Sequence, residues 1–173
     1  ADSQARVTRV KIMSMGPAGA GKSCLIKRFC EQRFVSKYIS TIGVDYGVKP
    51  HTVDGNTLKM NFWDLSGQPE FFDVRNEFYK DAQGCVLVFD VTDQSSFDAL
   101  DGWVQEAKKY GLKSAPVVVC ANKVDLKRAI TEREGREWAE SYGYAYYETS
   151  AQSGANVNEV FEYMFDEALK RTR

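Results

Sequence analysis

Near the start of the chain, apolar and polar residues follow first the pattern of a strand and then the pattern of a helix. In Val7–Met15 the alternation has a period of roughly two, which predicts a β-strand. The next periodic segment, Lys22–Gln32, carries apolar side chains at the spacing of one helix face, at Leu25, Ile26 and Phe29. The chain therefore opens with a strand, a short connection and a helix.

Further strands follow from the same patterns. Val44–Val53 and Thr57–Leu65 are predicted as strands joined by Asp54-Gly55-Asn56, because Asp-Gly between strand-like runs is typical of a tight antiparallel hairpin. Three more strands are predicted, two of them from nearly continuous apolar runs, as expected for strands covered on both faces. They are Gly84–Val91, Pro116–Ala121 and Tyr144–Glu148.

Four more helices alternate with these strands. A short, irregular helix is predicted for Phe71–Tyr79. The longer ones are Ser95–Tyr110, Thr131–Tyr142 and Asn156–Lys170. Six strands and about five helices in this order predict a three-layer α/β domain with a mostly parallel sheet and right-handed crossovers. In such sheets ligands bind at the carboxyl edge of the strands.

Two of the predicted helices have candidate N-caps. Ser95 or Ser96 is expected to cap the helix that begins there, because a serine side chain can accept a hydrogen bond from the first turn. Thr131 is followed three residues later by Glu134, which is the spacing of a capping box.

The composition fits one intracellular domain. The chain has 173 residues, of which 43% are apolar, and no repeat or linker divides it, so a single domain over 1–173 with an ordered core of about 7–170 is expected. The cysteines form no CxxC pair and indicate a reducing compartment. They are Cys24, Cys30, Cys85 and Cys120. A single histidine excludes a histidine-based triad or a histidine-rich metal site.

Charge and hydropathy restrict the partners. Lys and Arg number 23, Asp and Glu 24, and the net charge of -1 gives no reason to expect nucleic acid or general membrane attraction. No run of 18 apolar residues predicts a membrane span, and the C-terminal residues Lys170–Arg173 contain no cysteine for a prenyl group. The expectation is a cytoplasmic protein with no intrinsic membrane anchor visible. A nuclear location or one at the periphery of a membrane stays open.

The connection between the first strand and helix carries the strongest chemical signal. Gly16–Ser23 fits the phosphate-loop pattern G-x-x-x-x-G-K-[S/T] at every fixed position, and the alternative is a glycine-rich turn that matches by accident. Between a strand and a helix start, consecutive backbone N–H groups and the helix dipole form an anion site. Lys22 would add a charge on the outer phosphates, and the Ser23 hydroxyl would ligate Mg²⁺.

A second signal selects the base. Asn122-Lys123-Val124-Asp125 follows a predicted buried strand. A carboxylate such as that of Asp125 accepts two hydrogen bonds from guanine, at N1–H and the exocyclic amino group, whereas adenine presents a lone pair at N1. The Lys123 stem can lie along the base, and Asn122 can tie the loops together. The alternative is an ordinary surface turn.

Three further segments complete the pattern. In Trp63–Gln68, a carboxylate at Asp64 can hold Mg²⁺ through a water, the Gly67 N–H can approach a γ-phosphate, and Gln68 can orient a water molecule. Thr41 can complete the Mg²⁺ shell. The backbone N–H groups of Thr149–Gln152 can meet the guanine carbonyl oxygen.

These five segments, in this order and spacing, resemble a small GTPase of the Ras superfamily. Ile42–Tyr46 and Val88–Thr92 are similar to the Rab branch. Arg75–Asp81 and Phe34–Tyr38 look more like the Rab-like RJL group, many of whose members carry an added J-domain. The chain has no His-Pro-Asp motif, so no J-domain is expected within it.

The resemblance implies a P-loop G domain and a set of site residues. Nucleotide contacts are implied for Ala18, Gly19, Ala20, Gly21, Lys22, Ser23, Cys24, Phe34, Tyr38, Thr41, Gly67, Asn122, Lys123, Asp125, Ser150, Ala151 and Gln152. Catalysis would involve Gln68, Thr41, Lys22 and Gly67, and Mg²⁺ would be bound by Ser23 and Thr41 directly and by Asp64 through water. Effectors and regulators would bind a monomer at switch segments near Phe34–Tyr46 and Gly67–Tyr79.

Departures from the family pattern bear on hydrolysis. Ala18 stands where most members have glycine, and its methyl group crowds the space that a water-orienting Gln and an incoming arginine need. Pro17 stiffens that loop, and Pro69 restricts the backbone of Gln68. Gln152 replaces the family's usual Lys. The hypothesis is a GTP/GDP switch with Mg²⁺ and slow hydrolysis. The alternative is a non-catalytic, GTP-loaded interaction module, and an ATP-dependent kinase is disfavoured by Asp125.

Overall fold

The computed structural model describes residues 7–32, 37–41, 44–53, 56–65, 73, 76, 78–112 and 115–171. Their strands form a seven-stranded sheet in the order β2-β3-β4-β1-β5-β6-β7. The strands are β1 (Val7–Met15), β2 (Lys37–Thr41), β3 (Val44–Val53), β4 (Asn56–Leu65), β5 (Gly84–Asp90), β6 (Val117–Asn122) and β7 (Ala145–Glu148). β4, β1, β5, β6 and β7 run parallel to one another, and β3 is antiparallel to both β2 and β4.

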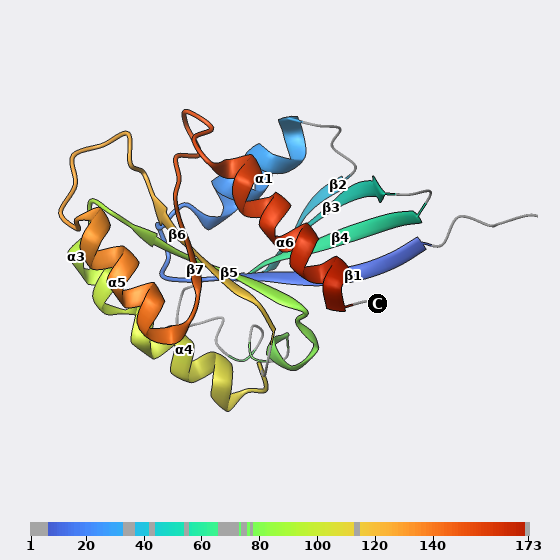
Figure 1. Cartoon of the computed structure of the whole chain (residues 1–173), viewed down its shortest axis with the longest axis horizontal. Helices are drawn as coiled ribbons and strands as arrows, with labels where there is room; N and C mark the ends of the chain where they lie inside the picture. The colour runs from blue at the N-terminus through green and yellow to red at the C-terminus, as the bar shows by residue number, and fades with distance from the viewer. Residues whose placement is uncertain are drawn as a thin grey trace, which may run out of the picture.

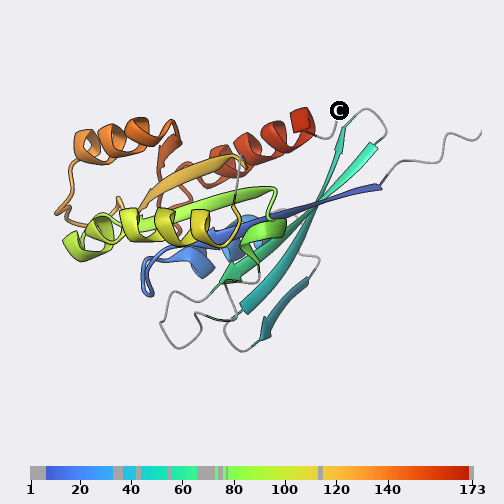
Figure 2. The ribbon, with the colours of Figure 1, turned by 90° about the horizontal axis from the view of Figure 1, so that it is seen from below.

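Helices cover both faces of this sheet. They are α1 (Lys22–Gln32), α3 (Gln94–Asp98), α4 (Leu100–Lys109), α5 (Glu132–Tyr142) and α6 (Val157–Arg171), with a 3₁₀ helix η2 (Tyr79–Asp81) before β5. α1 and α6 lie together over one face, and α4 and α5 over the other (Figures 1 and 2). The described residues therefore form the three-layer α/β fold that the alternating pattern predicts.

The central strands supply both cores at once. In β5, Val86 and Val88 face α1 and α6, whereas Cys85, Leu87 and Phe89 face α4 and α5. Both sets of side chains are buried, which is why the run reads as continuously apolar rather than alternating.

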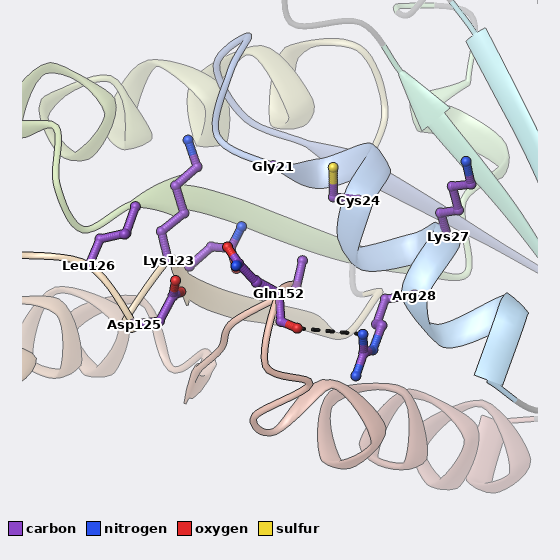
Figure 3. Close-up of a pocket in the computed structure, with 10 residues that line it drawn as sticks. Gly21, Cys24, Lys27, Arg28, Lys123, Asp125, Leu126 and Gln152 are labelled. Atoms are coloured by element: carbon purple, nitrogen blue, oxygen red, sulfur yellow. Dashed lines mark hydrogen bonds between the residues drawn. The ribbon is translucent and has the colours of Figure 1, made fainter.

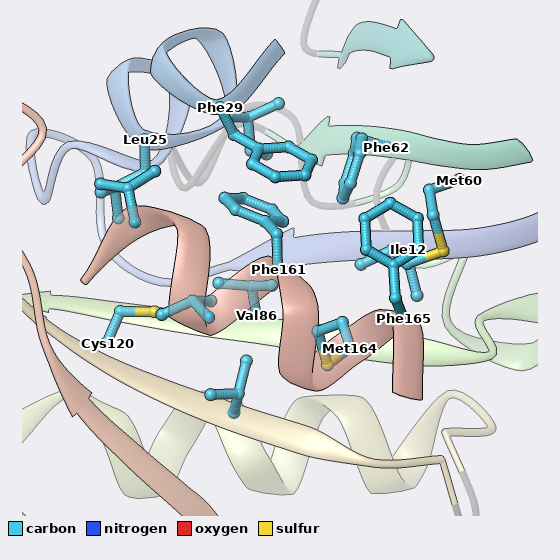
Figure 4. Packing of buried hydrophobic residues seen from close by; sticks show 14 of the residues in the cluster. Ile12, Leu25, Phe29, Met60, Phe62, Val86, Cys120, Phe161, Met164 and Phe165 are labelled. Atoms are coloured by element: carbon cyan, nitrogen blue, oxygen red, sulfur yellow. The ribbon is translucent and has the colours of Figure 1, made fainter. Parts of the chain in front are cut away.

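The core under α1 and α6 is largely aromatic. Figure 4 shows Phe29 of α1, Phe62 of β4 and Phe161 of α6 meeting over the sheet. The rings of Phe62 and Phe161 pack edge to face with centroids 5.0 Å apart, an arrangement that aromatic quadrupoles favour. This packing fixes α1 against the sheet and so places the loop that precedes it.

The sheet has one strand more than predicted. β2 was missed because Lys37–Thr41 has no apolar/polar alternation, and among the described strands β2 pairs with β3 alone, at the edge of the sheet. The predicted hairpin is confirmed by the pairing of β3 with β4, from Val44 opposite Leu65 to Val53 opposite Asn56. The turn residues Asp54 and Gly55 lie outside the described residues.

The predicted helix over Ser95–Tyr110 is wrong in two respects. It is two helices, α3 and α4, which meet at Ala99. The N-cap is Asp93, not Ser95 or Ser96, because the Asp93 carboxylate accepts the Ser95 N–H at 3.0 Å. Ser96 is buried, and its hydroxyl donates to the backbone carbonyls of Asp90 and Asp93.

Other helix predictions have clearer outcomes. Thr131 caps α5 as predicted and accepts the Glu134 N–H at 3.1 Å. Most of Phe71–Tyr79 lies outside the described residues, and η2 occupies its C-terminal end and continues to Asp81. Among the described residues, no helix combines the length and the apolar character that a bilayer crossing requires.

Candidate functional site

The phosphate-loop pattern and both of the later loops meet at the carboxyl edge of the sheet. A pocket of about 500 Å³ opens there between α1 and the loops that follow β6 and β7. Its lining consists of Gly21, Cys24, Lys27, Arg28, Asn122, Lys123, Asp125, Leu126, Ala151 and Gln152. Figure 3 shows Lys123, Asp125 and Leu126 on one side of it and Cys24, Lys27 and Arg28 of α1 on the other.

Sequence reasoning missed three of these lining residues. Lys27 and Arg28 lie one helical turn after Cys24 on α1, so a periodicity argument from Cys24 could have found them. Arg28 Nη1 lies 3.5 Å from the Gln152 carbonyl oxygen (Figure 3). Leu126 follows Asp125 directly, and its side chain is 52% exposed despite being apolar.

The glycines of the phosphate loop sit where a side chain would collide. Gly16 has φ +140°, and a Cβ there would lie 2.2 Å from the Val88 carbonyl oxygen. Gly21 has φ +93°, and a Cβ there would lie 2.3 Å from Asn122 Nδ2. Both positions thus require glycine for conformation and for space. The loop is held closely against β5 on one side and against the end of β6 on the other.

Lys22 is buried beneath the same loop. Its ammonium donates hydrogen bonds to the carbonyl oxygens of Gly16 at 2.7 Å and of Pro17 at 3.0 Å. Only 7% of the residue is exposed. A cation held in this way at a helix N-terminus forms, together with the backbone N–H groups, a positive site for an anion.

Ser23 and Asp64 form an oxygen cluster beside the loop. The Ser23 hydroxyl donates to one carboxylate oxygen of Asp64, and the Ser14 hydroxyl donates to the other at 2.7 Å. A hydroxyl and a carboxylate are the hard oxygen donors that Mg²⁺ prefers, so these residues fit that ion. Within the described residues, His, Cys, Asp and Glu form no group of three or more that could hold a metal.

Asn122 ties the phosphate loop to the loop after β7. Its amide nitrogen donates to the Ala20 carbonyl oxygen at 2.9 Å, and its amide oxygen accepts from the Thr149 hydroxyl at 3.1 Å. The residue is only 1% exposed. A buried amide with both ends bonded fixes the relative position of the three segments.

The side chain of Lys123 extends to the phosphate loop and to the end of β5. Its ammonium donates to the Gly19 carbonyl oxygen at 2.8 Å and lies 2.9 Å from Asp90 Oδ2. Burial raises the pKa of the Asp90 carboxyl, but hydrogen bonds from Thr92 and Lys123 outweigh that effect and hold the pKa below its ordinary value. Asp90 is thus ionised at neutral pH and paired with Lys123.

Asp125 lines the pocket, and its carboxylate is held by a residue from the loop after β7. Ser150, which is fully buried, donates its hydroxyl to Asp125 Oδ1 at 2.7 Å. The Ser150 N–H bonds the Ala155 carbonyl and the Thr149 N–H bonds the Ala121 carbonyl. Those two N–H groups, which sequence reasoning included among contacts to a base, have partners within the protein.

An ion pair that no motif indicated joins the loop after β6 to the end of β7. Arg128 donates two hydrogen bonds to the Glu148 carboxylate, one of them at 2.8 Å, and the Tyr146 hydroxyl donates to the same carboxylate at 2.9 Å. Arg128 lies three residues after Asp125, and Glu148 lies two residues before Ser150. The pair therefore links the segment that carries Asp125 to the segment that carries Ser150.

Several predicted site residues lie outside the described part of the chain. Phe34, Gly67 and Gln68 are not described. Tyr38 and Thr41 belong to β2, whose backbone is described but whose side chains are not. The structure thus brings together the phosphate loop, Asp64, the Asn122–Asp125 segment and Ser150–Gln152.

Comparison with known proteins gives one family. The model of the Ras family matches residues 11–170. The chain is 53% identical over 164 residues to DnaJ homolog subfamily C member 27 of Rattus norvegicus and 54% identical over 164 residues to that of Danio rerio. It is 52% identical over 167 residues to the protein of the same name from Homo sapiens.

These alignments cover most of this chain and less of the relatives. They include 91% of the chain for the rat and zebrafish proteins and 92% for the human one. They include only 60%, 60% and 61% of those proteins. The chain thus spans about three fifths of the length of the curated relatives it matches.

Proposed function

This chain belongs to the Ras family, in its Rab-like RJL group, and we propose that it is a guanine-nucleotide switch that binds GTP and GDP together with Mg²⁺. The observation that carries the proposal is the Asp125 carboxylate, which the Ser150 hydroxyl holds at 2.7 Å at one end of the pocket. Gly21 and Cys24, from the phosphate loop and the helix start after it, line the same pocket. The residue proposed to recognise the base and residues proposed to bind the phosphates therefore line one cavity.

The base is proposed to be guanine because of what a carboxylate can accept. Guanine offers two adjacent donors, N1–H and the exocyclic amino group, to Asp125. Adenine would leave the charge facing a lone pair, and sites that leave a buried polar group unpaired discriminate by about 10⁴. The guanine carbonyl oxygen would be met by the N–H groups of Ala151 and Gln152, since the Ser150 N–H is bonded to Ala155.

The triphosphate would lie along the phosphate loop. The backbone N–H groups of Ala18–Cys24 and the Lys22 ammonium would bind its oxygens, and Ser23, Thr41 and Asp64 would hold Mg²⁺. The ion would neutralise charge on the β- and γ-phosphates. Phe34 and Tyr38 are proposed to cover the base and the γ-phosphate.

Hydrolysis would proceed by attack of one water on the γ-phosphorus. The bond from that phosphorus to the β–γ bridging oxygen breaks, GDP and inorganic phosphate result, and the proton of the water passes to phosphate. Gln68 is proposed to orient the water, with Gly67 and Thr41 binding the γ-phosphate. The methyl group of Ala18, at the exposed tip of the loop, is proposed to make this step slow.

A second candidate function is a non-catalytic module that stays loaded with GTP. Ala18 and Pro69 favour it, whereas Gln68 and the pairing of Ser23 with Asp64 favour the switch. In either case protein effectors and regulators are proposed to bind a monomer near Phe34–Tyr46 and Gly67–Tyr79, in the cytoplasm. The domain is proposed to be a single G domain over 1–173.

One experiment separates these functions. The purified protein is denatured, the released nucleotide is identified by chromatography, and the loaded protein is followed in parallel at 25 °C. Released GDP together with measurable turnover supports the switch, and GTP that persists supports the loaded module. An adenine nucleotide, or none, would contradict both.

Calorimetry on nucleotide-stripped protein then tests the base reader. GDP should bind about 10⁴-fold more tightly than ADP. Asp125→Asn should reverse the preference toward xanthosine diphosphate, because xanthine pairs a carbonyl at C2 with the new amide NH₂ and its N1–H with the amide oxygen. Asp166→Asn, an exposed change on α6, is the matched control and should leave GDP affinity unchanged. Equal affinities for GDP and ADP in the unchanged protein would overturn the proposal.

A further inference from the structure

Asp90 is a buried carboxylate at the carboxyl end of β5, outside the five motifs. Its side chain is 10% exposed. Oδ1 accepts hydrogen bonds from the Thr92 N–H at 2.8 Å and from the Thr92 hydroxyl at 2.6 Å, and Oδ2 lies 2.9 Å from Lys123 Nζ. Both oxygens are thus bonded to the protein, and Asp90 is not among the residues that line the pocket.

Lys123 is constrained at both its backbone and its head. Its φ of +68° lies in the left-handed region, which a non-glycine residue keeps only when its surroundings hold it there. Its ammonium has two anchors, the Asp90 carboxylate and the Gly19 carbonyl oxygen. Between backbone and head, the side chain forms part of the pocket wall (Figure 3).

The two anchors differ in rigidity. Gly19 is at the open side of the phosphate loop, where a Cβ would meet nothing within 4 Å. Asp90 ends a strand whose residues are all buried, and it pairs in register with Asn122, next to Lys123. The sheet therefore defines the position of the Asp90 carboxylate more firmly than the loop defines its own carbonyl.

We propose that Asp90 is a positioning residue for the nucleotide: its carboxylate holds the Lys123 ammonium so that the lysine stem stays in place as a wall for the base and its head stays bonded to the phosphate loop. The inference rests on the proposed function and deepens it. It adds a residue that acts through Lys123 from outside the pocket. Retention of the nucleotide then depends on the charge of Asp90.

The test removes the negative charge of Asp90 and changes little else. Asp90→Asn keeps the size of the side chain and an acceptor for Thr92 but removes the ion pair. Dissociation of fluorescent GDP, measured in excess unlabelled GDP and Mg²⁺, should become about tenfold faster. Asp93→Asn is the matched control, because asparagine also caps a helix and the Asp93 carboxylate bonds Ser95, whereas the Lys123 ammonium bonds Asp90 and Gly19. Its rate should be unchanged.

A double-mutant cycle separates positioning from a general loosening. In a Lys123→Met background the ion pair is already lost, so Asp90→Asn should add no further increase in the dissociation rate. A purely structural role of Asp90 would instead multiply with the effect of Lys123→Met. Inosine diphosphate, which lacks the exocyclic amino group, should dissociate faster from Asp90→Asn by the same factor as GDP, since the Asp125 contact is not altered.

Several results would overturn the inference. They are an unchanged GDP dissociation rate in Asp90→Asn, multiplicative effects in the cycle, or a loss of preference for GDP over inosine diphosphate. Asp90→Ser, with the same expectations, serves if Asp90→Asn does not fold, as judged by circular dichroism. Failure of the unchanged protein to bind GDP would instead overturn the proposed function itself. That outcome is distinguishable from failure of the Asp90 inference, because it is measured without any variant.

Discussion

The buried hydroxyl of Ser150 donates a hydrogen bond of 2.7 Å to the carboxylate of Asp125, from a loop 25 residues further along the chain. The same hydroxyl accepts the Ser153 N–H at 3.1 Å, so its orientation is fixed. Asp125 is exposed, and an exposed carboxylate has rotamer freedom unless a neighbour restricts it. Ser150 thus orients the group proposed to read the base.

Ser150→Ala should weaken GDP binding about tenfold, because a hydrogen bond to a charged group contributes about 1.5–3 kcal/mol and part of that contribution orients Asp125. The preference for GDP over inosine diphosphate should fall as well, since the carboxylate no longer faces both donors. Calorimetry with the two nucleotides measures both effects. Ser141→Ala, an exposed change on α5, is the control. Unaltered GDP affinity in Ser150→Ala would show that Asp125 needs no such support.

Gly21→Ala should destabilise the protein more than an alanine at another left-handed glycine. At Gly143, the C-cap of α5 with φ +73°, a Cβ meets nothing within 4 Å, so alanine there costs about 1–2 kcal/mol for the backbone alone. At Gly21 the Cβ also displaces the Asn122 amide from Ala20, and a total of about 3 kcal/mol or more is expected. Urea unfolding of both variants measures the difference. Equal losses would mean that Asn122 moves aside freely.

The sequence predicted the parts of the site that depend on local patterns. The strand and helix around Gly16–Ser23, the Thr131 cap and the strand that leads into Asn122 follow from residues close together in the chain. The first two are found where expected, and the third is β6, one residue later than predicted. The N-cap of α3 was misassigned because Asp93, Ser95 and Ser96 are all good caps and only the geometry chooses among them. The side-chain chemistry alone does not decide which of these neighbouring residues caps the helix.

Features that join distant segments were not predictable from one sequence. The pair of Arg128 with Glu148 joins residues 20 apart, and Asp90 meets Lys123 only because β5 and β6 pair in register. Neither contact leaves a periodic or compositional signal. The edge strand β2 was missed for a related reason, since its five residues do not alternate and its pairing with β3 is made by backbone groups.

Ala18→Gly should speed GTP hydrolysis. The methyl group lies at the exposed tip of the phosphate loop, where the attacking water and Gln68 are proposed to meet, so removing it should raise the single-turnover rate about tenfold, or about 1.4 kcal/mol in activation free energy. The rate of the unchanged protein should lie below about 10⁻⁴ s⁻¹, under that of an ordinary Ras-like protein.

Chromatographic assays of GTP-loaded protein, sampled by hand over hours, give both rates. Ala129→Gly, an exposed change that does not line the pocket, should have no effect on hydrolysis. A fast rate in the unchanged protein would contradict slow hydrolysis itself. No gain in Ala18→Gly would remove the steric explanation only.

The ion pair of Glu148 with Arg128 should make stability depend on pH in the acid range. Burial raises the pKa of the Glu148 carboxyl, but hydrogen bonds from Arg128 and Tyr146 outweigh it and hold the pKa below its ordinary value. A carboxyl whose pKa is lowered by folding stabilises the folded state above its unfolded pKa of about 4.3, and that contribution is lost as pH falls through the folded pKa.

Glu148→Gln should therefore lower the free energy of unfolding by about 1 kcal/mol at pH 7, and the difference from the unchanged protein should shrink as pH falls below about 4.3. Urea unfolding from pH 7 downward measures it. Glu137→Gln is the matched control, because its pair with Arg133 is 64% and 88% exposed and such pairs contribute little. It should change the free energy of unfolding by less than about 0.5 kcal/mol at every pH. A Glu148→Gln difference that stays constant down to acid pH would mean that the packing of Glu148, and not its charge, links the loop of Asp125 to that of Ser150.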